Sequence, residues 1–181
     1  MLRENEFKEL LSGCLRGERH HQEKLYRRFS GLLFGICLRY SKNRSDAEDI
    51  LQDVFVKIYS KIGTFNHEGS FEGWLRRIAV NTSITFYKKS LKTAFHEDID
   101  EVDVPDEQLG SDFTNEELMR CVQNLPLGYR TVFNLYVIEG MKHKEISEYL
   151  GIDVNTSKSQ LSRSKAHLQK MLKELENVKN N

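Results

Sequence analysis

The side chains best suited to bind unpaired nucleic-acid bases recur along one stretch, 70–90, where the spacing of apolar residues predicts a helix. Four of them follow at intervals of three, four and seven residues, so they share one side of that helix. An indole ring stacks on a base, an amide bonds base edges, and cations hold phosphates. The stripe indicates contact with single-stranded DNA, although a core position for the tryptophan fits the same spacing. Its members are Trp74, Arg77, Asn81 and Lys88.

The loop 63–71 lies just before this stripe and adds aromatic rings and hydrogen-bonding side chains. Phe65 and Phe71 lie in it, and a loop of this kind can form a pocket for a flipped base. The apolar side of the following helix is predicted to be buried. That side comprises Phe71, Leu75, Ile78, Ala79 and Phe86.

A helix-turn-helix pattern lies near the end of the chain. The first helix is predicted over 142–150, and the second over 154–176, with Gly151 suited to a positive φ and Asp153 to an N-cap. The apolar side of the second helix comprises Val154, Leu161, Leu168 and Leu172. Its other sides carry groups for phosphates and base edges, which is typical of a recognition helix in the major groove, the alternative being an ordinary surface helix. These groups belong to Thr156, Lys158, Ser159, Gln160, Ser162, Arg163 and Lys165.

A helix with two unlike faces is predicted over 46–62. Its apolar face, expected in the core, comprises Ile50, Val54, Phe55, Ile58 and Ile62. Nearly opposite lie Asp46, Asp49 and Asp53. A solvated acidic stripe is one interpretation, and a docking face for a basic protein surface is the other. Because acids repel DNA phosphates, we expect this helix to face a protein.

These stretches belong to a chain that is predicted to be all-α. Only two prolines occur in 181 residues, and strand-like alternation is scarce. Further helices are predicted at about 3–16, 19–41, 115–124 and 127–138. Ser45-Asp-Ala-Glu48 and Thr114-Asn-Glu-Glu117 match capping boxes at helix starts, and Pro126 suits a helix entry.

An acidic segment separates two basic ones. Positions 96–117 hold ten acids and no lysine or arginine, which leaves 17 acids against all 27 basic residues in the rest of the chain. The formal net charge of zero is therefore a cancellation. Low helical periodicity, a proline and a glycine are typical of a linker. The sequence predicts two small helical domains, 1–92 and 113–181, joined by an acidic flexible linker, 93–112, with the helix-turn-helix in the second domain.

Signatures of enzymes and metal sites are missing from the sequence. The six histidines form no metal-ligand spacing, and no phosphate-binding loop, serine-hydrolase motif or dinucleotide glycine motif occurs. The three cysteines are odd in number, lack a C-x-x-C pair, and are expected in the core. We therefore expect no catalytic residues, no cofactor and no metal.

Membrane insertion is not expected either. No apolar run approaches the roughly 18 residues of a spanning helix. The first residues lack a basic region followed by an apolar stretch, so no signal peptide is expected. These features predict a cytoplasmic location.

Three motifs carry a family resemblance. The first is DAEDILQDVFVKIY at 46–59, and the second is FEGWLRRIAVN at 71–81. The third joins LPLGYRTVF at 125–133 with VNTSKSQLSR at 154–163. In this order and at these spacings, the motifs resemble the extracytoplasmic-function group of bacterial sigma factors, over most of the chain outside the linker.

The resemblance implies a subunit that directs RNA polymerase core to specific promoters and initiates transcription, in a stress- or signal-responsive regulon held in check by an anti-sigma factor. Its partners would be promoter DNA and, on core, the β′ clamp helices and the β flap. Core would contact Asp46, Asp49, Gln52 and Asp53. The minus-ten element would contact Phe65, Phe71, Trp74, Arg77, Asn81 and Lys88. The minus-thirty-five element would contact Thr156, Lys158, Ser159, Gln160, Arg163 and Lys165.

Two positions depart from the family's pattern. Ser157 stands where many members carry an apolar residue, so packing under the recognition helix is expected to differ. Gln160 stands where some members carry arginine, so the bases read are expected to differ.

The implied mechanism is a two-point reader, in which one domain binds duplex DNA and the other captures bases of the melted strand. The rival interpretation is an ordinary helix-turn-helix repressor or activator with a helical sensing domain. That protein would bind its operator tightly as a two-fold dimer without polymerase. No dimerisation heptad is apparent, which counts against the rival.

Overall fold

The chain forms two compact helical units. The structure, a computed structural model, describes residues 4–66, 68–88, 91 and 113–179. Contacts between residues divide the chain into units at 1–86 and 87–181. Among the described residues there is no strand, so the predicted all-α class is confirmed, and no helix is long and apolar enough to cross a membrane. The predicted linker 93–112 lies outside the described residues, so the domain boundaries at its ends stay predictions.

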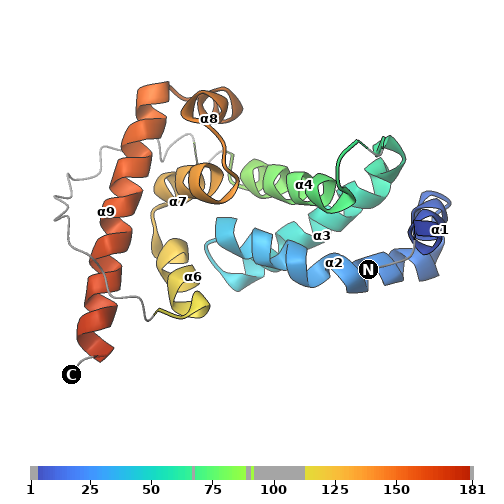
Figure 1. Cartoon of the computed structure of the whole chain (residues 1–181), viewed down its shortest axis with the longest axis horizontal. Helices are drawn as coiled ribbons and strands as arrows, with labels where there is room; N and C mark the ends of the chain where they lie inside the picture. The colour runs from blue at the N-terminus through green and yellow to red at the C-terminus, as the bar shows by residue number, and fades with distance from the viewer. Residues whose placement is uncertain (1–3, 67, 89–90, 92–112, 180–181) are drawn as a thin grey trace. The chain divides into compact units, whose positions relative to one another are not determined.

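Helices α2, α3 and α4 pack on one another to build unit 1, and α1 packs on α2 (Figure 1). A short 3₁₀ turn follows α3 before the loop that leads to α4. The bounds are α1 Glu4–Leu15, α2 Arg19–Tyr40, α3 Arg44–Lys61, the 3₁₀ turn Ile62–Thr64 and α4 Phe71–Phe86.

The core of unit 1 comes from apolar residues at helical spacing on the three packed helices. The predicted inner face of α3 is confirmed, because every member of it is at most 5% exposed. Burying each such side chain contributes about 1.5–3 kcal/mol. The core residues include Leu25, Leu33, Ile36, Ile50, Val54, Ile58, Leu75 and Ala79.

Helix α3 begins earlier than the sequence indicated. The side chain of Asn43 accepts a hydrogen bond of 2.8 Å from the backbone N–H of Asp46, so Asn43 is the N-cap. The capping box predicted at Ser45 is wrong, because an asparagine two residues upstream already caps the helix. Glu48 instead forms an ion pair with Arg44, one turn earlier, at 2.8 Å.

The inner face of α4 shifts along its length. Phe71, Leu75 and Ala79 are buried as predicted, but Phe86, the last residue of the helix, is 44% exposed. The second half of α4 buries Thr82 and Ser83 instead. Their hydroxyls have partners, because Lys57 Nζ lies 3.3 Å from Thr82 Oγ1 and Ser83 Oγ donates to the Ala79 carbonyl at 2.8 Å. Small bonded side chains therefore occupy positions that a simple apolar stripe assigns to larger ones.

Unit 2 is built around the long helix α9. Helices α6, α7 and α8 each contact it. The bounds are α6 Asn115–Asn124, α7 Leu127–Phe133, a π-helical turn Asn134–Ile138, α8 His143–Leu150 and α9 Val154–Lys179. Its core includes Cys121, Leu125, Tyr129, Val132, Leu135, Ile146 and Leu161.

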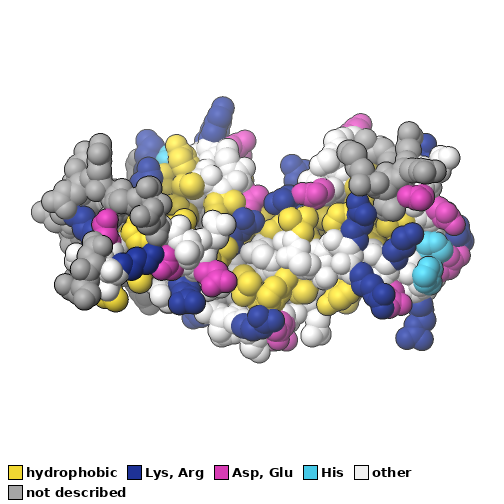
Figure 2. All heavy atoms as spheres, turned by 60° about the horizontal axis from the view of Figure 1, so that its bottom comes forward, with side chains coloured by type: hydrophobic (Ala, Val, Ile, Leu, Met, Phe, Trp, Pro, Cys, Tyr) yellow, Lys and Arg dark blue, Asp and Glu magenta, His cyan; other side chains and the backbone are white. Residues whose placement is uncertain are grey.

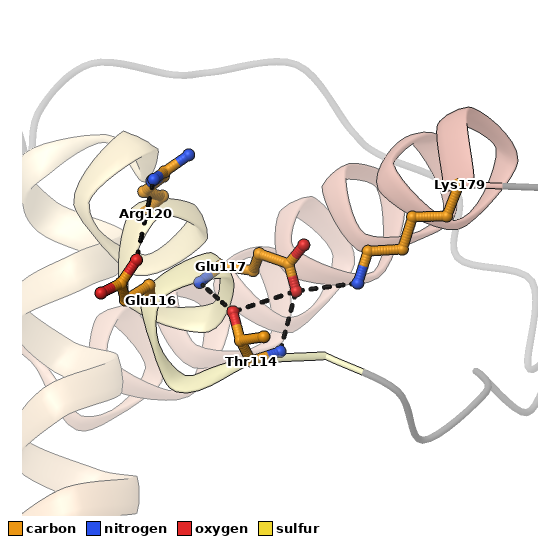
Figure 3. A network of polar contacts seen from close by, with 5 residues as sticks. All are labelled: Thr114, Glu116, Glu117, Arg120 and Lys179. Atoms are coloured by element: carbon orange, nitrogen blue, oxygen red, sulfur yellow. Dashed lines mark hydrogen bonds and ion pairs between the residues drawn. The ribbon is translucent and has the colours of Figure 1, made fainter.

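The start of α6 is fastened to the end of α9 (Figure 3). Thr114 and Glu117 form the predicted capping box, in which the Thr114 backbone N–H donates to Glu117 Oε2 at 2.8 Å. Lys179 Nζ lies 2.9 Å from the same carboxylate oxygen. Hydrogen bonds from Lys179 and Thr114 lower the pKa of Glu117 to about 2, so this carboxylate is charged at neutral pH.

The turn of the predicted helix-turn-helix is confirmed. Gly151 ends α8 in the left-handed region at φ 69°, where glycine is favoured. Asp153 Oδ1 then accepts a hydrogen bond of 2.7 Å from the Asn155 N–H at the start of α9. The two helices are therefore separated by three residues with turn chemistry at each end.

Candidate protein and nucleic-acid interfaces

The outer face of α3 presents acids to solvent. Asp49, Gln52 and Asp53 are exposed, and Asp46 is half-buried near the start of the helix. The structure therefore brings all four predicted residues to the side away from the core. This exposure suits contact with another molecule, and the acidic charge suits a basic protein rather than nucleic acid.

An apolar residue that the sequence analysis missed stands among these acids. Val56 is 67% exposed and follows Gln52 by one helical turn. A valine rimmed by charged and amide groups has the composition of a protein interface, with a small apolar centre and a polar rim. Its spacing from Asp49, seven residues, was a signal that could have identified it.

Five aromatic rings gather under the loop that precedes α4. The ring of Phe71 lies at their centre, with ring centroids 5.2 Å from Phe7, 5.8 Å from Phe29 and 5.1 Å from Phe65. The indole of Trp74 stacks on Phe71 at 5.5 Å and 20°. Aromatic pairs at such distances contribute about 0.5–1.5 kcal/mol beyond the burial of their area.

The ring cluster buries two residues that were expected to line a pocket for a flipped base. Phe65 is 9% exposed and Phe71 is 7% exposed, so they form a floor rather than the open lining of a pocket. Apolar rings without a polar group gain most from contact with one another, which explains why they turn inward. Trp74 is half-buried and lies against this floor.

The start of α4 is fixed by its own cap. Gly69 adopts φ 82°, and Ser70 Oγ accepts a hydrogen bond of 3.0 Å from the Gly73 N–H. The cap and the ring cluster together hold the first turn of α4 in one orientation. Trp74 lies on that first turn.

The remaining predicted base-binding residues are accessible. Arg77 and Asn81 follow Trp74 on α4 at intervals of three and four residues, and both are exposed. Lys88 is also exposed but lies beyond the end of α4 at Phe86. The structure therefore groups an indole, a guanidinium and an amide on one side of α4, and places the lysine past that helix.

The first turns of α9 carry the predicted groups for duplex DNA, with one exception. Lys158, Ser159 and Lys165 are exposed, and Thr156 and Arg163 are half-buried. The exception is Gln160, which is only 3% exposed. The expectation that it presents its amide outward is contradicted, because position 160 shares the inner side of α9 with buried Ser157 and Ser164.

Two further exposed residues extend this surface, of which Ser162 was predicted among the polar groups of this helix and Asn155 was not. Asn155 and Ser162 are both exposed. They stand three residues before and four residues after Lys158, so they share its side of α9. For Asn155, helical phase alone was a sufficient signal.

One face of the described residues is mixed in charge. On the face drawn in Figure 2, lysine and arginine side chains are interspersed with acids and uncharged groups rather than gathered in one basic patch. Non-specific affinity for DNA grows with the number of cations that meet phosphates. Cations dispersed in this way favour few phosphate contacts on this face.

Metal chemistry and thiol chemistry find no support in the residues that the structure describes. No group of three or more His, Cys, Asp or Glu side chains among them could hold a metal ion. All three cysteines are buried, and burial raises the pKa of Cys14 to about 11 and that of Cys37 to about 12. These thiols stay protonated at neutral pH and make poor ligands or nucleophiles.

Comparison with known proteins identifies both units. The family model "Sigma-70 region 2" matches residues 25–93, and "Sigma-70, region 4" matches residues 115–168. These matches cover the acidic face of α3, the side of α4 that is predicted to bind bases, and most of the helix-turn-helix.

Curated relatives agree with these matches. RNA polymerase sigma factor SigZ of Bacillus subtilis is 30% identical over 133 residues, which is 72% of this chain and 74% of the relative. ECF RNA polymerase sigma-E factor of Haemophilus influenzae is 26% identical over 92% of this chain and 95% of its own length. ECF RNA polymerase sigma factor SigE of Mycolicibacterium smegmatis is 29% identical over 83% of this chain, which spans 61% of that relative.

A solved structure has a similar fold. The sigma factor RpoE of Bartonella quintana, crystallised with the anti-sigma factor NepR, aligns with a TM-score of 0.50 and 21% identity. The alignment covers 83% of this chain and 96% of that one.

The ring cluster predicts which residues of this site govern stability. Phe71→Ala should lower the free energy of unfolding by about 3–5 kcal/mol, because it opens a cavity among four rings. Arg77→Ala, at an exposed position of the same helix, should change it by no more than about 0.5 kcal/mol. Urea unfolding followed by the fluorescence of Trp74, the only tryptophan, measures both. Equal effects of the two substitutions would refute the role given to the cluster.

Proposed function

This chain belongs to the extracytoplasmic-function group of sigma factors, and from that membership we propose that its two units read promoter DNA in two forms once RNA polymerase core has bound. The observation that carries the proposal is the order of the family matches, region 2 over unit 1 and region 4 over the helix-turn-helix of unit 2. The chain would direct core to specific promoters and initiate transcription there.

Core would dock on the outer face of α3. The exposed carboxylates of Asp49 and Asp53 would pair with basic residues of the β′ clamp helices, with Asp46 and Gln52 at the edge of the contact. Val56, one helical turn beyond Gln52, would supply apolar contact area. Complementary charge of this kind sets orientation and the rate of association more than it sets affinity.

Unit 1 would hold bases of the melted minus-ten element on α4. Asn81 would bond a base edge, Trp74 would stack, and Arg77 would hold a phosphate. Lys88, which lies past the end of unit 1, stays a proposed phosphate contact of the same element. Phe65 and Phe71 would support the binding surface from below, because their burial leaves little of either ring to meet a base. The rigid first turn of α4 favours this role, since a base binds best to side chains that are already in place.

Unit 2 would read the minus-thirty-five element in duplex DNA. The start of α9 would enter the major groove, with Lys158, Ser159 and Lys165 nearest the DNA and Thr156 and Arg163 beside them. Asn155 and Ser162 would extend the contact on the same side.

Strand opening exceeds what this chain can supply. Separating DNA strands costs about 1.4 kcal/mol of stacking per step. One or two captured bases return about 1–3 kcal/mol each, so polymerase must contribute the remainder.

The acidic segment 93–112 would thread into the polymerase cleft, where negative charge mimics nucleic acid.

Two further protein partners are proposed, the β flap of core and an anti-sigma factor. The β flap of core would bind unit 2, where Leu118, Val137 and Ile138 are each at least 40% exposed. An anti-sigma factor would restrain the protein until a stress or signal releases it, as the complex of RpoE with NepR suggests by analogy. Such a partner would cover the surfaces that core and DNA otherwise use.

Transcription in vitro tests the proposed function as a whole. Purified core with this protein should start RNA at distinct positions on a library of promoter fragments, and core alone should not. The absence of any distinct start would contradict the proposal.

Reversing charge on α3 should prevent docking. Asp49→Lys with Asp53→Lys should lower the affinity for core on the order of 100-fold, because like charges then meet across the contact. Binding is measured by fluorescence anisotropy of the labelled full chain, with unfolding curves to verify the fold. The control is Glu9→Lys with Glu23→Lys, an equal change in charge at exposed positions of α1 and α2. Equal affinity of the two double variants would remove the docking face.

Removing cations from α9 should weaken recognition of the upstream element. In complex with core, Lys158→Ala and Arg163→Ala should each lower the slope of log promoter affinity against log salt concentration by about one, because each removes one phosphate contact. Lys170→Ala, at an exposed position farther along α9, should leave it unchanged. A footprint and a salt slope identical to wild type for both variants would refute this assignment.

A further inference from the structure

One hydrogen bond joins the two helices of the helix-turn-helix away from the turn. His143 is the first residue of α8, and its Nδ1 lies 2.9 Å from Ser157 Oγ on α9. Ser157 is fully buried, so this hydroxyl is beneath the helix rather than on its DNA side. The family departure at position 157 thus places a polar contact where an apolar one is expected.

The turn provides a second attachment. Ser147 Oγ donates a hydrogen bond of 2.6 Å to the carbonyl of Ile152, and the Ile152 N–H donates to the Ser147 carbonyl at 3.1 Å. This pair fixes the point where α9 begins. Packing against α6, α7 and α8 limits how far α9 can rotate about its axis. The bond at Ser157, one turn into α9, adds a directional restraint near the start of the helix.

The imidazole of His143 is itself held in place. Its ring stacks on Tyr136, from the preceding π-helical turn, with centroids 4.5 Å apart at 26°. Burial lowers the pKa of His143, and the charges of Lys158 and Lys165 lower it further. A cation is also disfavoured at the first residue of a helix. The ring is therefore neutral at neutral pH and offers Nδ1 for one hydrogen bond with Ser157.

Small rotations of α9 matter because the DNA contacts are short. Side chains lie about 5–6 Å from the axis of a helix, so a rotation of about 10° moves them by about 1 Å. Hydrogen bonds tolerate a range of only about 0.5 Å. Ser157 lies between Thr156 and Lys158, so whatever holds Ser157 also sets where these two point.

We propose that His143 is a positioning residue, which fixes the rotation of α9 through its hydrogen bond to Ser157 and thereby sets which side chains reach the upstream promoter element. The inference rests on the proposed function. It assigns specificity to a contact between two helices rather than to a side chain on the proposed DNA side of α9.

The test uses the full chain with core on a promoter with an intact or a scrambled upstream element. His143→Phe, which keeps a ring for Tyr136, and Ser157→Ala should each reduce the preference for the intact element by about two- to tenfold. His143→Asn places an amide near the position of Nδ1 and should retain the preference. The double variant His143→Phe with Ser157→Ala should lose no more than either single variant.

Ser164→Ala is the matched control. Ser164 is also fully buried on α9, but its hydroxyl donates to the carbonyl of Leu161 within the same helix at 2.7 Å. This variant should keep the preference for the intact element, so loss of it would mean that any buried hydroxyl matters and would overturn the proposal.

Two further outcomes would overturn it as well. One is an unchanged preference in Ser157→Ala, which removes a single hydroxyl and is the change least able to unfold the unit. The other is equal loss in His143→Asn and His143→Phe. If the wild-type protein starts no RNA with core, the proposed function fails instead, and the two failures are thereby distinguished.

Discussion

The packing of aromatic rings around Phe71 is the contact on which the proposed base-binding side of α4 depends. It joins α1, α2 and the loop before α4 into one support, and Trp74 lies against it. A base gains little from a surface that must first be ordered, because the cost of ordering offsets the gain from stacking. The inward turn of Phe65 and Phe71 would therefore not weaken the proposed site, since both rings support Trp74.

Neither unit alone offers enough binding groups to recognise a promoter without RNA polymerase core. Unit 1 presents a half-buried indole with an exposed guanidinium and an exposed amide on α4, which would suffice for one or two bases. Unit 2 exposes a short polar side of α9. The acids on the outer face of α3 would oppose DNA if the chain bound it alone. Each surface becomes useful once core supplies the remaining free energy, which agrees with membership of the sigma family.

Periodicity in the sequence predicted the helices and most of their inner faces, because burial of an apolar side is what stabilises each helix. It failed where one polar group decided the local structure. Asn43 caps α3 ahead of the box expected at Ser45, and Gln160 turns inward although its type suits DNA. Val56 shows the converse, since an apolar residue lies exposed at the helical spacing of the acidic face. The pairing of His143 with residue 157 joins two helices and has no local signal.

The division of labour between chain and polymerase is tested most directly by the affinity of the purified full chain for promoter duplex, measured with and without core over a range of salt. The account predicts that the chain alone binds promoter and unrelated duplex equally, with dissociation constants of about 10⁻⁴–10⁻⁶ M at physiological salt. Promoter selectivity should emerge only with core. Nanomolar binding of one duplex sequence by the chain alone would contradict the account.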